Sequence, residues 1–269
     1  MKQLRNKALT ALEKELLLAE KQEIRLEKAA LKAKPSAIKC RLVGKIPDKV
    51  YSGLESAFCK AFTLVFAQGK NVIERSYKRE NIIAEHAIRD YAFELKGSRK
   101  ELKQLHKKSG KADLLNLTVT SIEGIGLGAL GVGMPDIVVF IGMLLKGVYE
   151  TALNYGFDYS SRREQIIILK MMETSLSFGE DWGEQNKYVD HLFESSDRDF
   201  EDCEFDLAIR SCASAFAADM LLLKFVQGFP LVGALGGAAN PVYYSKVMKY
   251  VGLKYKKQYL KRKIKDNTP

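Results

Sequence analysis

Residues that build metal centres and disulfide frameworks are scarce in this chain of 269 residues. It contains four cysteines (Cys40, Cys59, Cys203 and Cys212), none in a C-x-x-C pair, and three histidines that lie far apart in sequence. This spacing excludes the common zinc-binding patterns. The N-terminus is charged throughout and lacks the apolar core of a signal peptide. We therefore expect a reducing, cytoplasmic environment.

Motifs of the common enzyme classes are also missing. The sequence has no H-E-x-x-H, no G-x-S-x-G and no P-loop, so we predict no catalytic residue, no metal site and no cofactor. One acidic cluster comprises Asp197, Asp199, Glu201, Asp202, Glu204 and Asp206. It lacks the glycine and the spacing of an EF-hand, which favours a solvated loop. Metal-assisted hydrolysis of a lipid or phosphate ester at this cluster is the alternative.

Charge is abundant but unevenly distributed, and the net charge is +10. Residues 96–111 are basic, residues 173–206 are acidic, and the chain is basic again from Lys246 onward. The last segment predicts contact with an anionic membrane surface or with a membrane-protein complex. Nucleic acid is not expected, because a helix that turns Tyr255 and Tyr259 inward leaves no exposed ring for base stacking. Solubility alone, or pairing with the acidic segment, would explain the charge equally well.

Apolar residues recur at helical spacing along most of the chain, and strand alternation is hard to find. The pattern predicts an all-α fold, a single domain of about eight to ten helices. Residues 1–34 are interpreted as a charged helical extension and residues 40–265 as the main domain. A helix from Pro47 should end with Gly69 as its C-cap, and Ser161 with Glu164 forms a capping box. Residues 112–122 are ambiguous.

Two glycine-rich apolar segments stand out, each ending shortly before a proline-started helix. The first contains G126-L-G-A-L-G131, which fits the dinucleotide pattern G-x-G-x-x-G. Its context contradicts that function: no strand precedes it, Pro135 starts a helix too soon, and no acidic ribose ligand follows. A single membrane span is disfavoured by Asp136 at its centre, which costs ~2.5–3.5 kcal/mol. Close helix packing and a shallow hairpin at a membrane surface remain open.

The second glycine-rich segment repeats the letters G-A-L-G at 233–236, before Pro241. The similarity predicts two hairpin-like segments packed together, with chance resemblance as the alternative. Together with the basic tail, these segments supply the candidate residues for membrane or partner contact. They are Gly126, Gly128, Gly131, Gly133, Pro135, Gly233, Gly236, Gly237, Lys254, Lys256, Lys257, Lys261, Arg262 and Lys263.

Three longer stretches carry a resemblance to a known family. They are GKIPDKVYSGLESAF, GVGMPDIVVFIGMLLKGVYETALNYGFDYSSRREQIIILKMM and KFVQGFPLVGALGGAANPVYYSKVMKYVGLKYKKQYL. Across about residues 40 to 261 the chain resembles the EcsC protein family, which is named after a protein encoded beside the ATPase and membrane subunits of an ABC transporter. The resemblance implies a cytoplasmic, membrane-proximal accessory protein without established catalytic residues. A purely soluble protein-interaction module is the remaining alternative.

Overall fold

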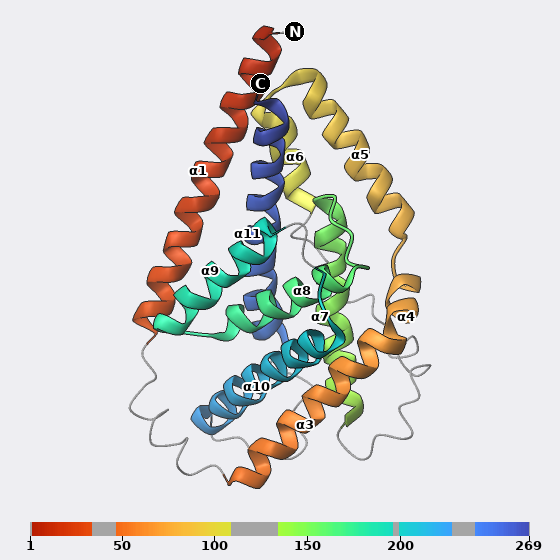
Figure 1. Ribbon diagram of the computed structural model, residues 1–269, viewed down its shortest axis with the longest axis vertical. Coiled ribbons are helices and arrows are strands. Elements are labelled where there is room, and N and C mark those ends of the chain that lie inside the picture. The colour runs from red at the N-terminus through yellow and green to blue at the C-terminus, as the bar shows by residue number, and fades with distance from the viewer. Residues whose placement is uncertain (1, 34–46, 109–133, 196–198, 228–239, 269) are drawn as a thin grey trace.

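A computed structural model describes residues 2–33, 47–108, 134–195, 199–227 and 240–268 (Figure 1). Within these ranges the chain forms ten α-helices and one π-helical turn, and no strand. The all-α prediction is therefore confirmed, and the number of helices lies within the predicted range. Gly126, Gly128, Gly131, Gly133, Gly233, Gly236 and Gly237 lie outside the described residues, as do residues 112–122.

The helices follow the apolar periodicity of the sequence closely. They are α1 (Lys2–Lys32), α3 (Asp48–Leu64), α4 (Lys70–Arg75), α5 (Arg79–Lys96), α6 (Arg99–Lys108), α7 (Met134–Asn154), α8 (Arg162–Leu176), α9 (Glu180–Glu194), α10 (Asp202–Gln227) and α11 (Asn240–Asn267). The π-helical turn η1 (Val65–Gly69) joins α3 to α4.

The prediction that Gly69 caps a helix C-terminus is wrong. Gly69 has φ −76° and ψ −19°, so it stays in the right-handed region, and η1 carries the chain straight into α4. A glycine ends a helix readily when it adopts the left-handed conformation. Gly97, with φ 58°, does so after α5, and Gly156, with φ 73°, does so after α7. The break expected at Gly69 comes instead between Arg75 and Arg79.

The predicted N-cap at Ser161 is confirmed. Its side chain accepts a hydrogen bond from the backbone N–H of Glu164, at 3.1 Å. The Glu164 carboxylate, however, accepts a hydrogen bond from the Tyr255 hydroxyl of α11, at 2.6 Å. Only the serine half of the predicted capping box is therefore present, and the Glu164 side chain ties α8 to α11.

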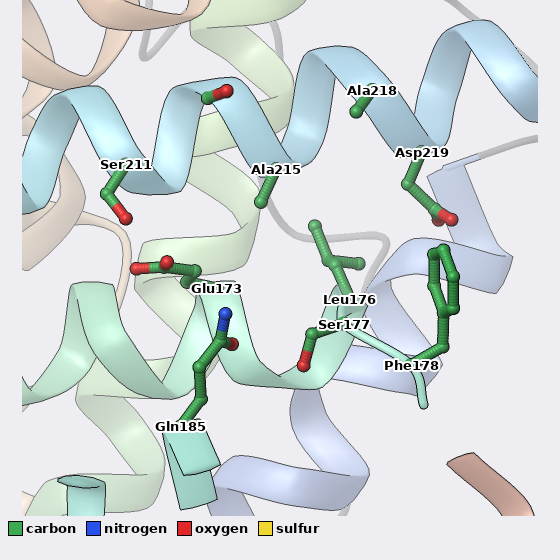
Figure 2. Close-up of a pocket in the computed structure, with 10 residues that line it drawn as sticks. Glu173, Leu176, Ser177, Phe178, Gln185, Ser211, Ala215, Ala218 and Asp219 are labelled. Carbon is green, nitrogen blue, oxygen red and sulfur yellow. The ribbon is translucent and has the colours of Figure 1, made fainter. Parts of the chain in front are cut away.

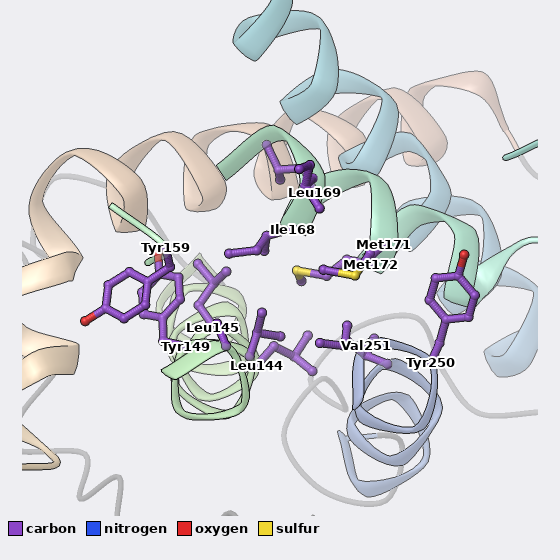
Figure 3. Close-up of a cluster of buried hydrophobic side chains, with 14 of the residues drawn as sticks. Leu144, Leu145, Tyr149, Tyr159, Ile168, Leu169, Met171, Met172, Tyr250 and Val251 are labelled. Atoms are coloured by element: carbon purple, nitrogen blue, oxygen red, sulfur yellow. The ribbon is translucent and has the colours of Figure 1, made fainter. Parts of the chain in front are cut away.

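Helix α11 runs through the middle of the molecule, with α1, α7 and α8 packed around it (Figure 1). Leu144 and Leu145 of α7, Met171 and Met172 of α8, and Val251 of α11 meet in the core (Figure 3). A Cβ atom on Gly147 would lie 2.5 Å from the Tyr244 hydroxyl. The glycine therefore leaves room on α7 for the Tyr244 side chain of α11.

The charged N-terminal segment is a helix, as predicted, and it is packed into the same core as the rest of the chain. Leu12 and Ala19 are buried, and Leu16 and Leu26 pack at the edge of the main hydrophobic cluster. Helix α1 contacts α5, α6, α9 and α11. Helix α1 is therefore an integral part of the helical bundle.

Helices α7 and α11 begin in the half of the molecule away from the two termini, where α3 and α10 extend further still (Figure 1). Each starts one residue before a proline, at Met134 and at Asn240. The rings of Phe140 and Tyr243, one or two turns further along, lie in edge-to-face contact with centroids 6.2 Å apart. The two helices that follow the glycine-rich segments are therefore direct neighbours.

Candidate functional site

The basic residues predicted to contact a membrane lie on α11, and the structure turns most of their charge inward. Lys254 is fully buried, and Lys257 and Lys263 are nearly so. Buried ammonium groups require charged partners, because removing each ion from water costs on the order of several kcal/mol. Each of these lysines has such partners on a neighbouring helix.

The central ion-pair cluster joins α1, α9 and α11. Lys254 donates to Glu23 at 2.9 Å and to Asp190 at 2.7 Å. Lys257 binds the second oxygens of the same two carboxylates, at 2.5 Å and 3.1 Å. Burial alone would raise the pKa of Glu23 and of Asp190, but the two lysines outweigh it and hold each pKa below its ordinary value.

Two further ion-pair groups follow along α11. Lys256 donates to Glu15 of α1 at 2.9 Å, and Arg99 of α6 binds the other oxygen of that carboxylate. Lys263 donates to Asp90 at 2.6 Å and to Glu94 at 2.8 Å, both on α5. Four of the predicted contact lysines thus hold helices together.

Lys261 and Arg262 are the members of the predicted basic tail that keep access to solvent. The Lys261 side chain is 35% exposed and pairs with the exposed Glu194 at 3.1 Å. Arg262 donates to the backbone carbonyl of Tyr155 at 3.2 Å, and its guanidinium lies 4.8 Å from the centre of the Phe157 ring. Both therefore have protein partners, but neither is buried.

A cavity of about 290 Å³ opens between α8, α9 and α10 (Figure 2). Small side chains on one face of α10 leave this space, and Glu173, Gln185 and Asp219 supply polar groups to its wall. The small residues are Ser211, Ser214, Ala215 and Ala218. Their spacing of three and four residues puts them on one helical face. That spacing is a signal for this cavity in the sequence, although the cavity was not predicted from it.

The carboxylates of this cavity are only partly exposed, and each has one ion-pair partner. Glu173 accepts from Lys170 at 2.9 Å, and Asp219 accepts from Lys246 at 3.5 Å. The Gln185 Oε1 atom is buried and has no hydrogen-bond partner among the described residues. Such an unpaired buried acceptor costs about 1–3 kcal/mol unless a ligand or water pairs with it.

A second cavity of about 270 Å³ adjoins the first. The two share Ser177, Phe178 and Asp219 in their walls. The second is lined by apolar parts of α1 and by Trp182, and carries Lys246 and Lys249 at its α11 side. The first cavity therefore carries the carboxylates of Glu173 and Asp219, and the second carries the two lysines.

A comparison with known protein families gives a clear match over most of the chain. The model of the EcsC protein family matches residues 11–260. The chain belongs to the EcsC protein family. Protein EcsC of Bacillus subtilis (strain 168) is 22% identical over 217 residues, which cover 76% of each chain. No solved structure matches the chain.

The family match begins further toward the N-terminus than the sequence resemblance suggested. It includes most of α1, the segment interpreted as an extension before an EcsC-like domain. This agrees with the packing of α1 against α11 and with the ion pairs that Glu15 and Glu23 make there.

The acidic cluster considered for metal binding is spread out in this EcsC family member. Asp202 pairs with Arg162 at 2.9 Å, and Glu204 accepts from the backbone N–H of Glu201 at 3.1 Å. Asp197 lies outside the described residues. In the part of the chain that the structure describes, no three His, Cys, Asp or Glu side chains come together as metal ligands would.

A single membrane span was already disfavoured from the sequence, and the described helices do not supply one. None of them combines the length and the apolar character that crossing a bilayer would require. Helix α7 holds the apolar run from Ile137 to Leu145, whose side chains are mostly buried within the bundle. The apolar side chains of α7 therefore form part of the hydrophobic core.

Proposed function

We propose that this EcsC family member is a non-enzymatic, cytoplasmic accessory protein that binds peripherally to a membrane surface or to a membrane-protein complex such as an ABC transporter. The contact is made by the end of the molecule at which α7 and α11 begin, which we call the glycine end. We assign the contact to the two glycine-rich segments, to Pro135 and to the first turns of the two helices.

One observation carries this proposal. The two glycine-rich apolar segments lead into helices that start side by side, as the contact between Phe140 and Tyr243 shows. The first turns of α7 and α11, which these segments precede, lie in the half of the molecule away from both termini (Figure 1). We expect two apolar segments that lead into neighbouring helices to form a larger patch than either alone, and large apolar patches are typical of interaction sites.

Exposed residues near the start of α11 suit contact with a lipid headgroup region. Val242 is 57% exposed, and Lys246 and Lys249 are exposed one and two turns later. An apolar side chain beside lysines is the combination by which peripheral proteins bind anionic bilayers. The buried lysines of α11 contribute to the fold instead, so the proposal assigns surface contact mainly to the glycine end.

Vesicle flotation tests the proposal. The full-length protein is mixed with phosphatidylcholine vesicles, with or without phosphatidylglycerol, at low and at high salt. We expect flotation with the anionic vesicles at low salt, and loss of flotation in the double variant Leu130→Asp/Leu235→Asp. Both leucines belong to the G-A-L-G repeats. Leu95→Asp is the matched control, since Leu95 is an exposed leucine of α5.

The outcomes separate the alternatives. Binding that is equal in the double variant and in the control would reject the glycine end as the contact surface. A wild-type protein that does not float under any condition would reject direct lipid binding. In that case, co-purification with detergent-solubilised membrane proteins that the double variant abolishes would support the membrane-protein complex. Failure of both assays would favour a purely soluble interaction module.

A further inference from the structure

The outer face of α1 carries a repeat of seven residues. The segments EKELLLA, EKQEIRL and EKAALKA follow one another over residues 13–33, and each opens with Glu-Lys and has an apolar residue at its fifth position. Leu17 is 50% exposed, Ile24 is 47% exposed and Leu31 is 50% exposed. Seven residues make almost two turns of an α-helix, so these three residues form one apolar row along α1.

The apolar row faces away from the rest of the molecule. Leu12 and Ala19, which are buried, project roughly 140–160° away from Leu17 around the helix axis, at about 3.6 residues per turn. Glu15 is buried on the same inner side and pairs with Lys256 of α11. Helix α1 itself lies along the edge of the molecule (Figure 1). A second helix can therefore reach the row from outside.

Charged side chains flank the apolar row, and their signs are sorted. The glutamate and the lysine that open each repeat stand four and three residues before its apolar residue, which places them on opposite sides of the row. They are Glu13, Glu20 and Glu27 on one side, and Lys14, Lys21 and Lys28 on the other. In the part of the chain that the structure describes, none of the six forms an ion pair, whereas Glu15 and Glu23 on the inner side both do.

This sorting does not stabilise the helix by itself. A solvated helix is stabilised by opposite charges three or four residues apart, but no acidic residue between positions 13 and 33 stands at that distance from a basic one. Lys21 stands four residues before Arg25, and Lys28 four residues before Lys32, and like charges at this spacing repel. An apolar row between one acidic and one basic flank instead favours pairing with a second helix.

We propose that two copies of this chain pair through the outer faces of α1, with the two helices parallel and related by a two-fold axis that runs along them. Each residue of the apolar row then meets its counterpart, and the glutamates of one helix lie beside the lysines of the other. An antiparallel pair would place glutamates beside glutamates and lysines beside lysines, which repel. The charges therefore favour the parallel pair.

The interface is small, because a single row of apolar residues is narrower than the seam of a full coiled coil. We therefore expect a reversible dimer with a dissociation constant of roughly 10–100 µM. Helix α1 runs from the end that holds the two termini toward the half of the molecule in which α7 and α11 begin (Figure 1). A two-fold axis along α1 thus directs the glycine ends of both copies the same way, although the pairing does not depend on membrane contact.

Analytical ultracentrifugation of the full-length protein tests the pairing. Between roughly 1 and 500 µM we expect the protein to change from monomer to dimer. Ile24→Asp, at the centre of the row, should weaken the dimer by roughly tenfold or more. Ile88→Asp is the matched control, because Ile88 is a 68% exposed isoleucine of α5, and it should leave the dissociation constant unchanged.

Charge exchange tests the flanks of the row, and it stays informative if Ile24→Asp does not fold. One variant makes both flanks acidic, and the other makes both flanks basic. They are Lys14→Glu/Lys21→Glu/Lys28→Glu and Glu13→Lys/Glu20→Lys/Glu27→Lys. Each variant alone should stay monomeric at concentrations where the wild type dimerises, because its flanks repel, and an equimolar mixture of the two should recover the dimer.

Disulfide cross-linking tests the direction of the helices. Leu17→Cys and Leu31→Cys proteins, told apart by an affinity tag on one of them, are mixed and oxidised, with the wild type as the control for the native cysteines. The parallel pair predicts cross-links between equal positions. An antiparallel pair centred on Ile24 would instead join position 17 of one copy to position 31 of the other.

A wild-type protein that remains monomeric at roughly 500 µM would overturn the proposal. An equal loss of dimer in Ile24→Asp and Ile88→Asp would do the same, because it would place the contact elsewhere. So would a mixture of the two charge-exchange variants that stays monomeric. Cross-links that join position 17 to position 31 would contradict the parallel arrangement.

Discussion

The Lys254 ammonium group donates a hydrogen bond to Asp190 at 2.7 Å, inside the protein and out of contact with solvent. Asp190 belongs to α9, and the lysine lies 64 residues further along the chain. Glu23 of α1 completes the arrangement at 2.9 Å from the same ammonium. The basic sequence around Lys254 predicts a surface position for it. In the structure this lysine instead links α1, α9 and α11.

Removal of this ammonium should destabilise the fold strongly. Lys254→Met keeps most of the side-chain volume but leaves Glu23 and Asp190 with one lysine fewer in a partly buried site. We expect the free energy of unfolding to fall by about 3 kcal/mol or more, as for other broken buried ion pairs. Urea denaturation followed by circular dichroism measures this change.

Lys261→Met is the matched control, because the same substitution removes an ion pair that solvent reaches. Exposed pairs contribute about 1 kcal/mol or less, so this variant should unfold close to the wild type. Equal effects of the two substitutions would show that the buried ion pairs of α11 do not stabilise the bundle.

Glu164 gives the fold a specific dependence on pH. Burial raises its pKa to about 7, although the hydrogen bond from Tyr255 and the charge of Arg163 act in the opposite direction. The folded state therefore holds a proton between the ordinary pKa of 4.5 and about 7, where the unfolded chain has released it. The stabilisation from this proton is complete below 4.5 and is lost as pH rises through about 7.

Glu164→Gln tests this dependence, since the amide is neutral at every pH and its oxygen can still accept the Tyr255 hydrogen bond. Relative to the wild type, the variant should gain stability between about pH 5 and pH 8, by a few kcal/mol at roughly 1.4 kcal/mol per pKa unit. Thermal melts of both proteins at the two pH values measure the gain. A difference that does not change with pH would contradict a raised pKa in the folded protein.

Gly156 is required by the backbone at the end of α7. Its φ of 73° lies in the left-handed region, and a Cβ atom there would collide with His86 of α5. Gly156→Ala should cost about 1–2 kcal/mol from the backbone alone, and more from the displaced imidazole. Chemical denaturation of the variant measures the loss.

Gly53 offers a control for the same substitution. It lies within α3, and no atom approaches the position of its Cβ within 4 Å. Gly53→Ala should therefore stabilise the protein by about 0.5–1 kcal/mol through the better helix propensity of alanine. Destabilisation of similar size at both positions would contradict the local explanation for Gly156.

The helices themselves were largely predictable, because helical periodicity and capping are local properties of the sequence. Ser161 illustrates this, since its capping partner is only three residues away. Gly69 shows where prediction from local sequence fails. A glycine caps a helix only if the chain leaves the helix there, and at Gly69 the chain continues through η1 into α4. Composition does not distinguish these two outcomes for a glycine.

The structural role of the basic residues of α11 could not be predicted, because it depends on contacts with distant parts of the chain. Glu23 lies 231 residues before Lys254, and no periodicity within α11 could indicate that this carboxylate lies opposite. The cavity beside α10 had a local signal in its small residues, but Glu173 and Gln185 in its wall come from α8 and α9. The sequence shows which residues are charged and which are small. Their contact partners are determined by how the helices pack, which the local sequence does not show.

The orientation of the protein at a membrane tests the central claim most directly. Tryptophans placed at position 130 or 235, by Leu130→Trp or Leu235→Trp, report on the glycine end, and Lys261→Trp reports on the end that carries the C-terminus. Trp182 is buried and serves as the internal reference. With anionic vesicles made from brominated lipids, we predict quenching of the added fluorescence at 130 and 235 and none at 261. Quenching at 261 without quenching at 130 and 235 would contradict the account.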